Sequence, residues 1–220
     1  MKVPFQNRAE AGRLLAEKLM KYKDRHDVIV LGLPRGGVPV AYEVASRLRL
    51  PLDVFIVRKL GLPGFSELAM GAIASGGVRV VNQELVQHIP NARTLLDLVA
   101  EVETAEIERR EHAYRDGRPA LDVRGRTVIL VDDGLATGAT MRAAAEALRQ
   151  REIASIIVAV PVGSPQTCRQ FEREVDETIC ALAPRWFAAV GQYYKDFSQT
   201  TDDEVRELLT LAAQRSPAPE

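Results

Sequence analysis

Two adjacent carboxylates, Asp132 and Asp133, stand where an apolar run gives way to a turn of small residues. The run TVILV before them predicts a buried strand, and the residues GLATGAT after them predict a tight turn that opens a helix. Such a turn leaves backbone N–H groups free, and the N-terminus of a helix favours an anion. The hydroxyls of Thr137 and Thr140 can add donors. This stretch therefore predicts a phosphate site, with two acceptors for sugar hydroxyls directly before it.

Other kinds of phosphate loop do not fit this chain. The Walker A string GxxxxGK[ST] and the dinucleotide fingerprint GxGxxG are both absent from the sequence. A phosphoacceptor aspartate of the receiver type stays open in principle, although nothing in its context requires a Thr-Gly-Ala-Thr turn. The simplest structural alternative is a chance strand, turn and helix with an exposed pair of aspartates.

The segment VILVDDGLATGAT is similar to the motif that binds 5-phosphoribosyl-1-pyrophosphate (PRPP) in the type I phosphoribosyltransferases, and its form is closest to the adenine version. The resemblance implies that Asp132 and Asp133 hold the 2- and 3-hydroxyls of the ribose, directly or through bound Mg²⁺. Family members that act on hypoxanthine or guanine tend to carry an acid at the position of Ala136, which argues against those acceptors. The residues implied to surround the 5-phosphate are Gly134, Leu135, Ala136, Thr137, Gly138, Ala139 and Thr140.

A second loop, Pro34-Arg35-Gly36-Gly37, follows the first expected strand. Its glycines let backbone amides approach a diphosphate, and Arg35 offers a fork of donors. The position resembles that of the pyrophosphate loop in the same family, which often holds an unusual cis peptide. By that resemblance the Pro34–Arg35 bond is the candidate, and all four residues are expected to contact PRPP. The alternative is a plain strand-to-helix turn with an exposed arginine.

A basic pair, Arg58 and Lys59, ends the second expected strand and leads into a Gly- and Pro-rich stretch that runs to Gly77. We expect a long loop here, with a hairpin formed by MGAIA and VRVVN. The loop resembles the flexible catalytic loop of the family, whose closure excludes water from the reacting sugar. The resemblance assigns catalytic roles to Lys59 and Glu67, alongside Arg35 and the two aspartates, and counts Arg58 and Lys59 among the PRPP contacts. The alternative is a mobile surface loop.

The elements around these motifs alternate between strand and helix, which predicts an α/β fold with a mostly parallel central sheet flanked by helices. Ligands of such sheets bind at the carboxyl ends of the strands. The resemblance adds a type I phosphoribosyltransferase fold with a small hood and a long helical insertion. We expect one domain over residues 1–220, with its core at about 25–165, the insertion at about 92–116 and the hood at about 166–215. Expected strands are 27–33, 52–57, 127–134, 154–162 and 177–182, and expected helices are 7–22, 38–47, 92–114, 138–149 and 166–172, with a further one after Thr201.

Composition narrows the class of partner. The 220 residues carry a net charge of −1, so no bulk field favours nucleic acid. No apolar run approaches the ~20 residues of a membrane span, and the N-terminus has no apolar signal core, so we expect a cytoplasmic protein. In that compartment Cys168 and Cys180 are expected to be two buried free thiols. We expect PRPP and a small-molecule acceptor as ligands, and a homo-oligomer, most simply a dimer.

Two functions remain open at this point. The first is transfer of phosphoribose to a nitrogenous acceptor, most plausibly a nucleobase, with release of pyrophosphate. The second is a regulator that keeps the PRPP site without turnover. The aromatic residues Trp186, Phe187, Tyr193, Tyr194 and Phe197 could stack on a flat base or could simply pack against the core. The helix at 92–114 is either a solvated arm or a dimer contact.

Overall fold

A computed structural model describes residues 5–215, except for the side chains of Ser66 and Glu67. Its centre is a five-stranded sheet in the order β2-β1-β6-β7-β8, and every pairing in it is parallel. The α/β fold with a parallel central sheet is therefore confirmed. The strands are β1 (Val28–Gly32), β2 (Leu52–Val54), β6 (Thr127–Val131), β7 (Ser155–Val162) and β8 (Glu177–Leu182).

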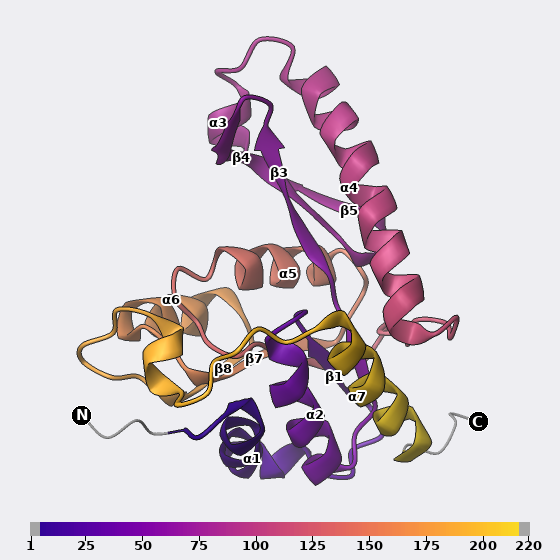
Figure 1. Ribbon diagram of the computed structural model, residues 1–220. Helices are drawn as coiled ribbons and strands as arrows, with labels where there is room; N and C mark the ends of the chain where they lie inside the picture. Colours follow the sequence, from indigo (N-terminus) through magenta and orange to yellow (C-terminus); the bar gives the residue numbers. More distant parts are fainter. Residues whose placement is uncertain (1–4, 216–220) are drawn as a thin grey trace.

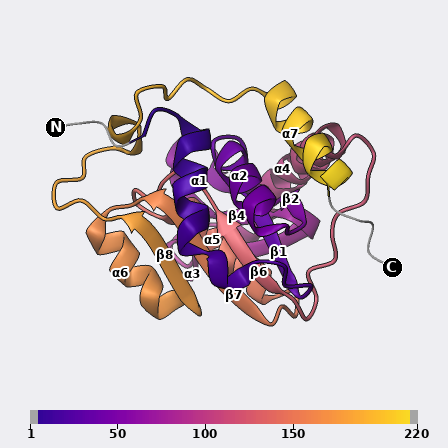
Figure 2. The same ribbon diagram turned by 90° about the horizontal axis from the view of Figure 1, so that it is seen from below.

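Helices cover both faces of this sheet, which is why its strands are apolar along their whole length. Alternate residues of β6 divide between the two faces: Ile129 and Val131 pack with α1 and α2, and Val128 and Leu130 pack with α5 and α6. Figure 2 shows α1 and α2 in front of the sheet and α6 beside β8. The four helices are α1 (Arg8–Lys18), α2 (Gly37–Leu48), α5 (Ala139–Arg149) and α6 (Pro165–Glu174).

Residues 57–115 form an arm that projects from this core (Figure 1). A three-stranded antiparallel sheet in the order β3-β4-β5 packs against one side of the long helix α4. The buried contact side of α4 includes Leu96, Ala100 and Ile107, which meet Leu60 of β3. The arm consists of β3 (Val57–Leu62), β4 (Phe65–Ala74), β5 (Val78–Val81), α3 (Gln83–Val86) and α4 (Ala92–Arg115).

The long loop expected from Arg58 to Gly77 is wrong, because most of these residues pair as strands. β3 and β4 form a hairpin closed by the pair Leu62↔Phe65, with a register irregularity at Gly61. Its Gly and Pro residues therefore mark a tight turn and a bulge rather than an extended loop. The strand expected at 52–57 is also divided, since β2 ends at Val54 and β3 begins three residues later. The hairpin expected between MGAIA and VRVVN is confirmed as β4 with β5.

The C-terminal part of the chain returns across the molecule. β8, inside the segment expected as a hood, is the fifth strand of the central sheet. The last helix, α7 (Asp202–Arg215), packs on α2 and α4, and the hydroxyl of Thr201 accepts from Glu204 N at 3.1 Å at its start.

Short 3₁₀ helices lie at η1 (Met20–Tyr22), η2 (Ser75–Gly77) and η3 (Val190–Tyr193). Within residues 5–215, no helix has the length and apolar character to cross a bilayer.

The two cysteines were expected to be free thiols, and that expectation is wrong. Cys168 in α6 and Cys180 in β8 are joined by a disulfide. The expectation rested on the reducing compartment alone, and twelve residues of separation gave no motif to suggest pairing. Packing of α6 on β8 is what brings the two sulfur atoms together. The bond ties the start of α6 to the edge strand of the sheet.

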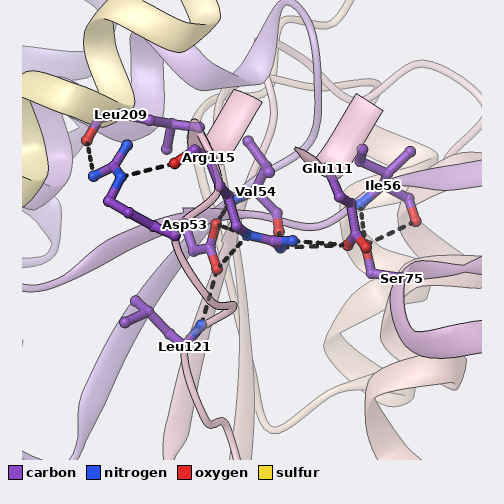
Figure 3. A network of polar contacts seen from close by, with 9 residues as sticks. Asp53, Val54, Ile56, Ser75, Glu111, Arg115, Leu121 and Leu209 are labelled. Atoms are coloured by element: carbon purple, nitrogen blue, oxygen red, sulfur yellow. Dashed lines mark hydrogen bonds and ion pairs between the residues drawn. The ribbon is translucent and has the colours of Figure 1, made fainter. Parts of the chain in front are cut away.

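One buried ion pair joins the arm to the core (Figure 3). Arg115, the last residue of α4, donates from Nε to Asp53 Oδ1 of β2 at 2.9 Å, and their side chains are only 10% and 7% exposed. The Asp53 carboxylate also accepts from the backbone amides of Val54 and Leu121. Arg115 makes a further ion pair with Glu111, one turn earlier in α4. Every oxygen of the Asp53 carboxylate is thus paired, as a buried charge requires.

Because this pair is buried, breaking it on one side should be costly. Asp53→Asn keeps the shape but leaves Arg115 with Glu111 as its only ion-pair partner, and we expect the free energy of unfolding to fall by about 3 kcal/mol in urea titration. The matched control is Asp122→Asn, which removes an exposed pair with Arg124 and should leave the free energy of unfolding nearly unchanged. Equal losses in the two variants would contradict a structural role for the Asp53–Arg115 pair.

Candidate active site

The two predicted phosphate loops leave neighbouring strands at the same edge of the sheet. β1 pairs with β6 up to Gly32↔Val131, and Leu33 N then donates to Val131 O at 2.9 Å. Residues 34–37 follow β1, and residues 132–140 follow β6, at the carboxyl ends of both strands. In open α/β sheets this edge is where ligands bind. The structure therefore brings the acid pair and the Arg35 loop together.

Two glycines allow this close approach. A Cβ built on Gly36 would overlap Asp133 Oδ2, and one on Gly37 would lie 2.7 Å from Val131 O and 2.8 Å from Asp132 Cα. No residue with a side chain fits at either position without moving its neighbour. The Pro34–Arg35 peptide in this loop is cis, as expected from its position.

The small-residue turn presents free amides to solvent. Leu135 N donates to Val162 O and Ser164 N donates to Leu135 O, so the turn is anchored on the loop after β7. Beyond this anchor, the amides of residues 136–138 have no acceptor within residues 5–215. Thr137 and Thr140 are exposed, and α5 begins at Ala139. Free amides at a helix start form an anion site.

Neighbouring structure holds the outer side of this turn. The Thr167 hydroxyl of α6 donates to Ala136 O at 2.6 Å. Gly138 has a left-handed backbone with φ of 77°, and it packs against Thr167 and Phe171. The first turns of α6, which also carry the disulfide, therefore fix the path of the turn.

The acid pair is half-buried and electrostatically frustrated. Burial, and then repulsion from Asp133, raise the pKa of Asp132 well above its usual range. Burial also raises the pKa of Asp133, although the adjacent Arg8 guanidinium works against that rise. Asp132 Oδ1 accepts from Asp133 N at 2.8 Å, which orients the first carboxylate. The raised pKa values mean that the ionised carboxylates are destabilised in the free protein. A ligand that is a cation or that donates hydroxyl hydrogen bonds would stabilise them.

Two residues that the sequence did not suggest contact Asp133. Arg8 Nε of α1 lies 2.8 Å from Asp133 Oδ2, and the Tyr194 hydroxyl donates to Asp133 O at 2.6 Å. Burial and the nearby Asp133 charge raise the pKa of Tyr194. Neither residue belongs to a motif, and each is far from Asp133 in the chain. Tyr194 was noted only as one of several aromatic residues with an open role.

Arg35 extends from its loop toward the N-terminus of α7. Its Nη1 lies 4.0 Å from Asp202 Oδ1, and the side chain is 34% exposed. The same carboxylate accepts from the Tyr114 hydroxyl of α4 at 2.5 Å. Burial, and then this hydrogen bond, raise the pKa of Tyr114 to about 12. Arg35 is thus lightly held at the site edge, where its donors stay accessible.

The basic pair on β3 divides between the two faces of the hairpin. Arg58 Nε donates to Glu103 Oε2 of α4 at 2.6 Å, so its charge is paired inside the arm. Lys59 is exposed and, by strand alternation, lies on the other face, with Val57, which packs on the α5 side. Glu67 falls within β4, and its side chain lies outside the described part of the chain. Of the expected basic residues, Lys59 is the one directed away from α4.

The glycine geometry predicts two separable defects. Gly37→Ala collides with backbone atoms of β6 and should lower the melting temperature by several degrees in a thermal scan. Gly36→Ala collides instead with the Asp133 carboxylate, a side chain that can move only by giving up its contact with Arg8. The variant should therefore fold with a smaller loss and bind anionic sugar ligands more weakly in calorimetry. The same loss of stability in both variants would contradict this distinction.

The raised pKa of Asp132 gives a stability prediction with a definite sign. An aspartate whose folded-state pKa is raised contributes stability below its unfolded value, about 3.9, and loses it as the pH rises through the folded value. Asp132→Asn keeps the Oδ1 acceptor without the charge, so it should melt at a higher temperature than the wild type at pH 7. The difference should vanish toward pH 3. A variant that is less stable at pH 7 would refute the assigned cause.

The amino-acid sequence matches one known protein family and several of its members. Residues 5–197 match the family model described as a phosphoribosyl transferase domain. A Mycobacterium tuberculosis protein whose name marks it as a provisional phosphoribosyl transferase is 45% identical over 208 residues, which cover 94% of this chain and 47% of that protein. A hypoxanthine-guanine phosphoribosyltransferase of Streptococcus pneumoniae is 22% identical over 189 residues, which cover 85% of this chain and 81% of that enzyme.

A solved structure extends the likeness to the whole described fold. The crystal structure of TT1426 from Thermus thermophilus is 40% identical, covers 97% of this chain and 99% of that chain, and superposes with a TM-score of 0.83. The chain spans about half the length of the M. tuberculosis relatives that it matches. Because the family model covers residues 5–197 out of 220, the chain belongs to the phosphoribosyl transferase domain family.

Proposed function

We propose that this protein is a phosphoribosyltransferase, which transfers 5-phosphoribose from PRPP to a nitrogenous acceptor and releases pyrophosphate. The observation that carries the proposal is one juxtaposition. A half-buried acid pair, a turn with free amides and a basic loop with closely packed glycines meet at one edge of the sheet. PRPP has three parts to match them: the hydroxyls of its ribose, its 5-phosphate and its diphosphate.

Each part of PRPP has a matching group. The free amides of residues 136–138, with the Thr137 and Thr140 hydroxyls, suit the 5-phosphate. Asp132 and Asp133 accept from the ribose hydroxyls. The backbone amides of Arg35 and Gly36, which have no acceptor among the described residues, and the Arg35 fork suit the diphosphate. Lys59 supplies a further positive charge from the hairpin.

The donor set also fits Mg²⁺. This ion binds oxygen ligands, and it usually takes one or two carboxylates from the protein and the rest from substrate phosphates and water. Asp132 and Asp133 offer that number. The part of the chain that the structure describes has no group of three or more His, Cys, Asp or Glu side chains that could hold a metal ion. Bound Mg²⁺ would neutralise charge on the diphosphate, and the aspartates would hold it there.

The reaction follows from these contacts. The bond from the ribose anomeric carbon to pyrophosphate breaks, and its electron pair leaves with pyrophosphate. A bond from that carbon to an acceptor nitrogen forms, and the proton of that nitrogen is released to water. The ring becomes positive in between, and the two aspartates beside it stabilise that charge. Arg35 and Lys59 stabilise the leaving diphosphate. Most of the catalysis is then positioning and charge neutralisation.

The acceptor is most simply a nucleobase, as the name of the S. pneumoniae relative indicates for that enzyme. Ala136 offers no acidic group beside a purine, which argues against hypoxanthine and guanine. The net charge of −1 favours small-molecule ligands over nucleic acid. We further expect a cytoplasmic homodimer, with Leu98 and Val102 on the exposed face of α4 available for contact.

The competing function is a regulator that binds PRPP without turnover. It would need the small-residue turn at 134–140, here called the phosphate turn, and the acid pair, but no basic group on the hairpin. The exposed Lys59 on the side away from α4 favours an enzyme. Pyrophosphate release separates the two functions, since only the enzyme produces it.

A panel of nucleobases with PRPP and Mg²⁺, read by pyrophosphate release, tests this proposal. We expect turnover with at least one base. Lys59→Met should lower kcat about 10- to 100-fold, because it removes a charge from the leaving group. Its matched control is Arg58→Met, whose lost ion pair with Glu103 should affect stability more than kcat. PRPP binding without release for any base would favour the regulator, and a greater loss of kcat in Arg58→Met would reverse the roles of the two residues.

A further inference from the structure

Arg8 is held by three groups at once. Its Nε donates to Asp133 Oδ2 at 2.8 Å, its Nη1 donates to Ser198 O at 2.6 Å, and its guanidinium lies 4.1 Å above the centre of the Phe197 ring. The side chains of Arg8 and Asp133 are only 12% and 16% exposed. A planar guanidinium suits this combination of stacking and directed donors. An arginine fixed in this way has little freedom to swing away.

The segment before α1 and the segment before α7 build this arrangement. Phe5 N donates to Tyr193 O, and Lys195 N donates back to Phe5 O, so the segment before α1 pairs with the segment after η3. Phe5 and Tyr194 are buried, and their rings lie 5.3 Å apart. This pairing places the Phe197 ring against the Arg8 guanidinium. We call residues 193–198 the C-terminal brace.

The brace and Arg8 each contact Asp133 at one point. Tyr194 holds its backbone carbonyl, and Arg8 holds one oxygen of its side chain. The other oxygen, Oδ1, accepts no hydrogen bond from any described residue. The carboxylate is therefore fixed in orientation with one oxygen available. Gly36 packs directly against the bonded oxygen, which leaves the pair no room to shift that way.

Charge makes the contact matter for a ligand. Asp132 and Asp133 together would carry two negative charges in a half-buried site, next to the place proposed for an anionic substrate. Arg8 is in contact with Asp133, and its positive charge partly offsets the charge of the pair. A site without it would present a less ordered carboxylate and a stronger repulsion toward phosphate groups.

We propose that Arg8 is a positioning residue of the PRPP site, which orients the Asp133 carboxylate toward the ribose and is itself held by the C-terminal brace. This inference rests on the proposed function. It means that residues 193–198 act on PRPP through Arg8, although they lie sixty or more residues from the acid pair. Arg8 is not a catalytic residue in this account, since it contacts Asp133 and not the substrate.

Calorimetric titration of PRPP with Mg²⁺ into four proteins tests the proposal. Arg8→Met keeps the length of the side chain without its donors, and we expect PRPP to bind about 10- to 100-fold more weakly, the range for a hydrogen bond to a charged group. Arg8→Lys should recover part of that loss, because it restores the charge but not the two directed donors to Asp133 and Ser198. The matched control is Arg13→Met on the same helix, which removes an exposed pair with Glu43 and should bind PRPP like the wild type.

A double-mutant cycle separates positioning from general stability. Phe197→Leu should weaken PRPP binding a few-fold in the wild type and should add nothing to Arg8→Met, because both act through the same guanidinium. Melting temperatures identify variants that are merely less stable. If Arg8→Met does not fold, Arg8→Lys and Phe197→Leu still must weaken binding.

The outcomes are distinct. The role of Arg8 would be overturned if Arg8→Met bound PRPP within about twofold of the wild type. If Arg8→Met does not fold, the same result for Arg8→Lys and Phe197→Leu would overturn it. Either result would leave the proposed function intact. Additive effects of Phe197→Leu and Arg8→Met would overturn the link through the brace. A wild type that does not bind PRPP would instead remove the proposed function, and the role of Arg8 with it.

Discussion

The site depends on one packing constraint, the contact between the loop after β1 and the acid pair after β6. Parallel pairing of these strands brings both loops to one edge, and the absence of side chains at Gly36 and Gly37 lets them touch. A phosphate turn on β6 alone would be a generic anion site. The second loop, packed against the carboxylates, brings Arg35 to the same edge of the sheet. The rest of the fold keeps these two loops in position relative to each other.

Three distant parts of the chain maintain that arrangement. The start of α6 supports the phosphate turn from outside through Thr167 and is tied to β8 by the disulfide. The brace at 193–198 holds Asp133 through Tyr194 and Arg8. The arm is anchored to the core by the buried Asp53–Arg115 pair, so the hairpin that carries Lys59 has a fixed base (Figure 3). Stability and site geometry are thus linked by a few polar contacts over a largely apolar core.

How much of this could be predicted from the sequence depends on distance along the chain. The acid pair, the phosphate turn and the Arg35 loop are contiguous segments with local chemistry, and the parallel sheet follows from apolar runs that alternate with helices. Arg8 lies 125 residues from Asp133, and no spacing rule connects them. The disulfide depends on how α6 packs on β8, which composition does not encode. The Gly and Pro residues after Arg58 predict a loop, whereas in the structure they form the turn and the bulge of the hairpin between β3 and β4.

The central claim is that the acid pair and the two loops form one PRPP site. Calorimetric titration of PRPP into the wild type and into Asp132→Asn with Asp133→Asn, each with and without Mg²⁺, addresses it most directly. The account predicts saturable binding that is stronger with Mg²⁺ in the wild type, and loss of that binding in a folded double variant. Equal binding by the double variant, or no binding by the wild type at millimolar PRPP, would contradict it.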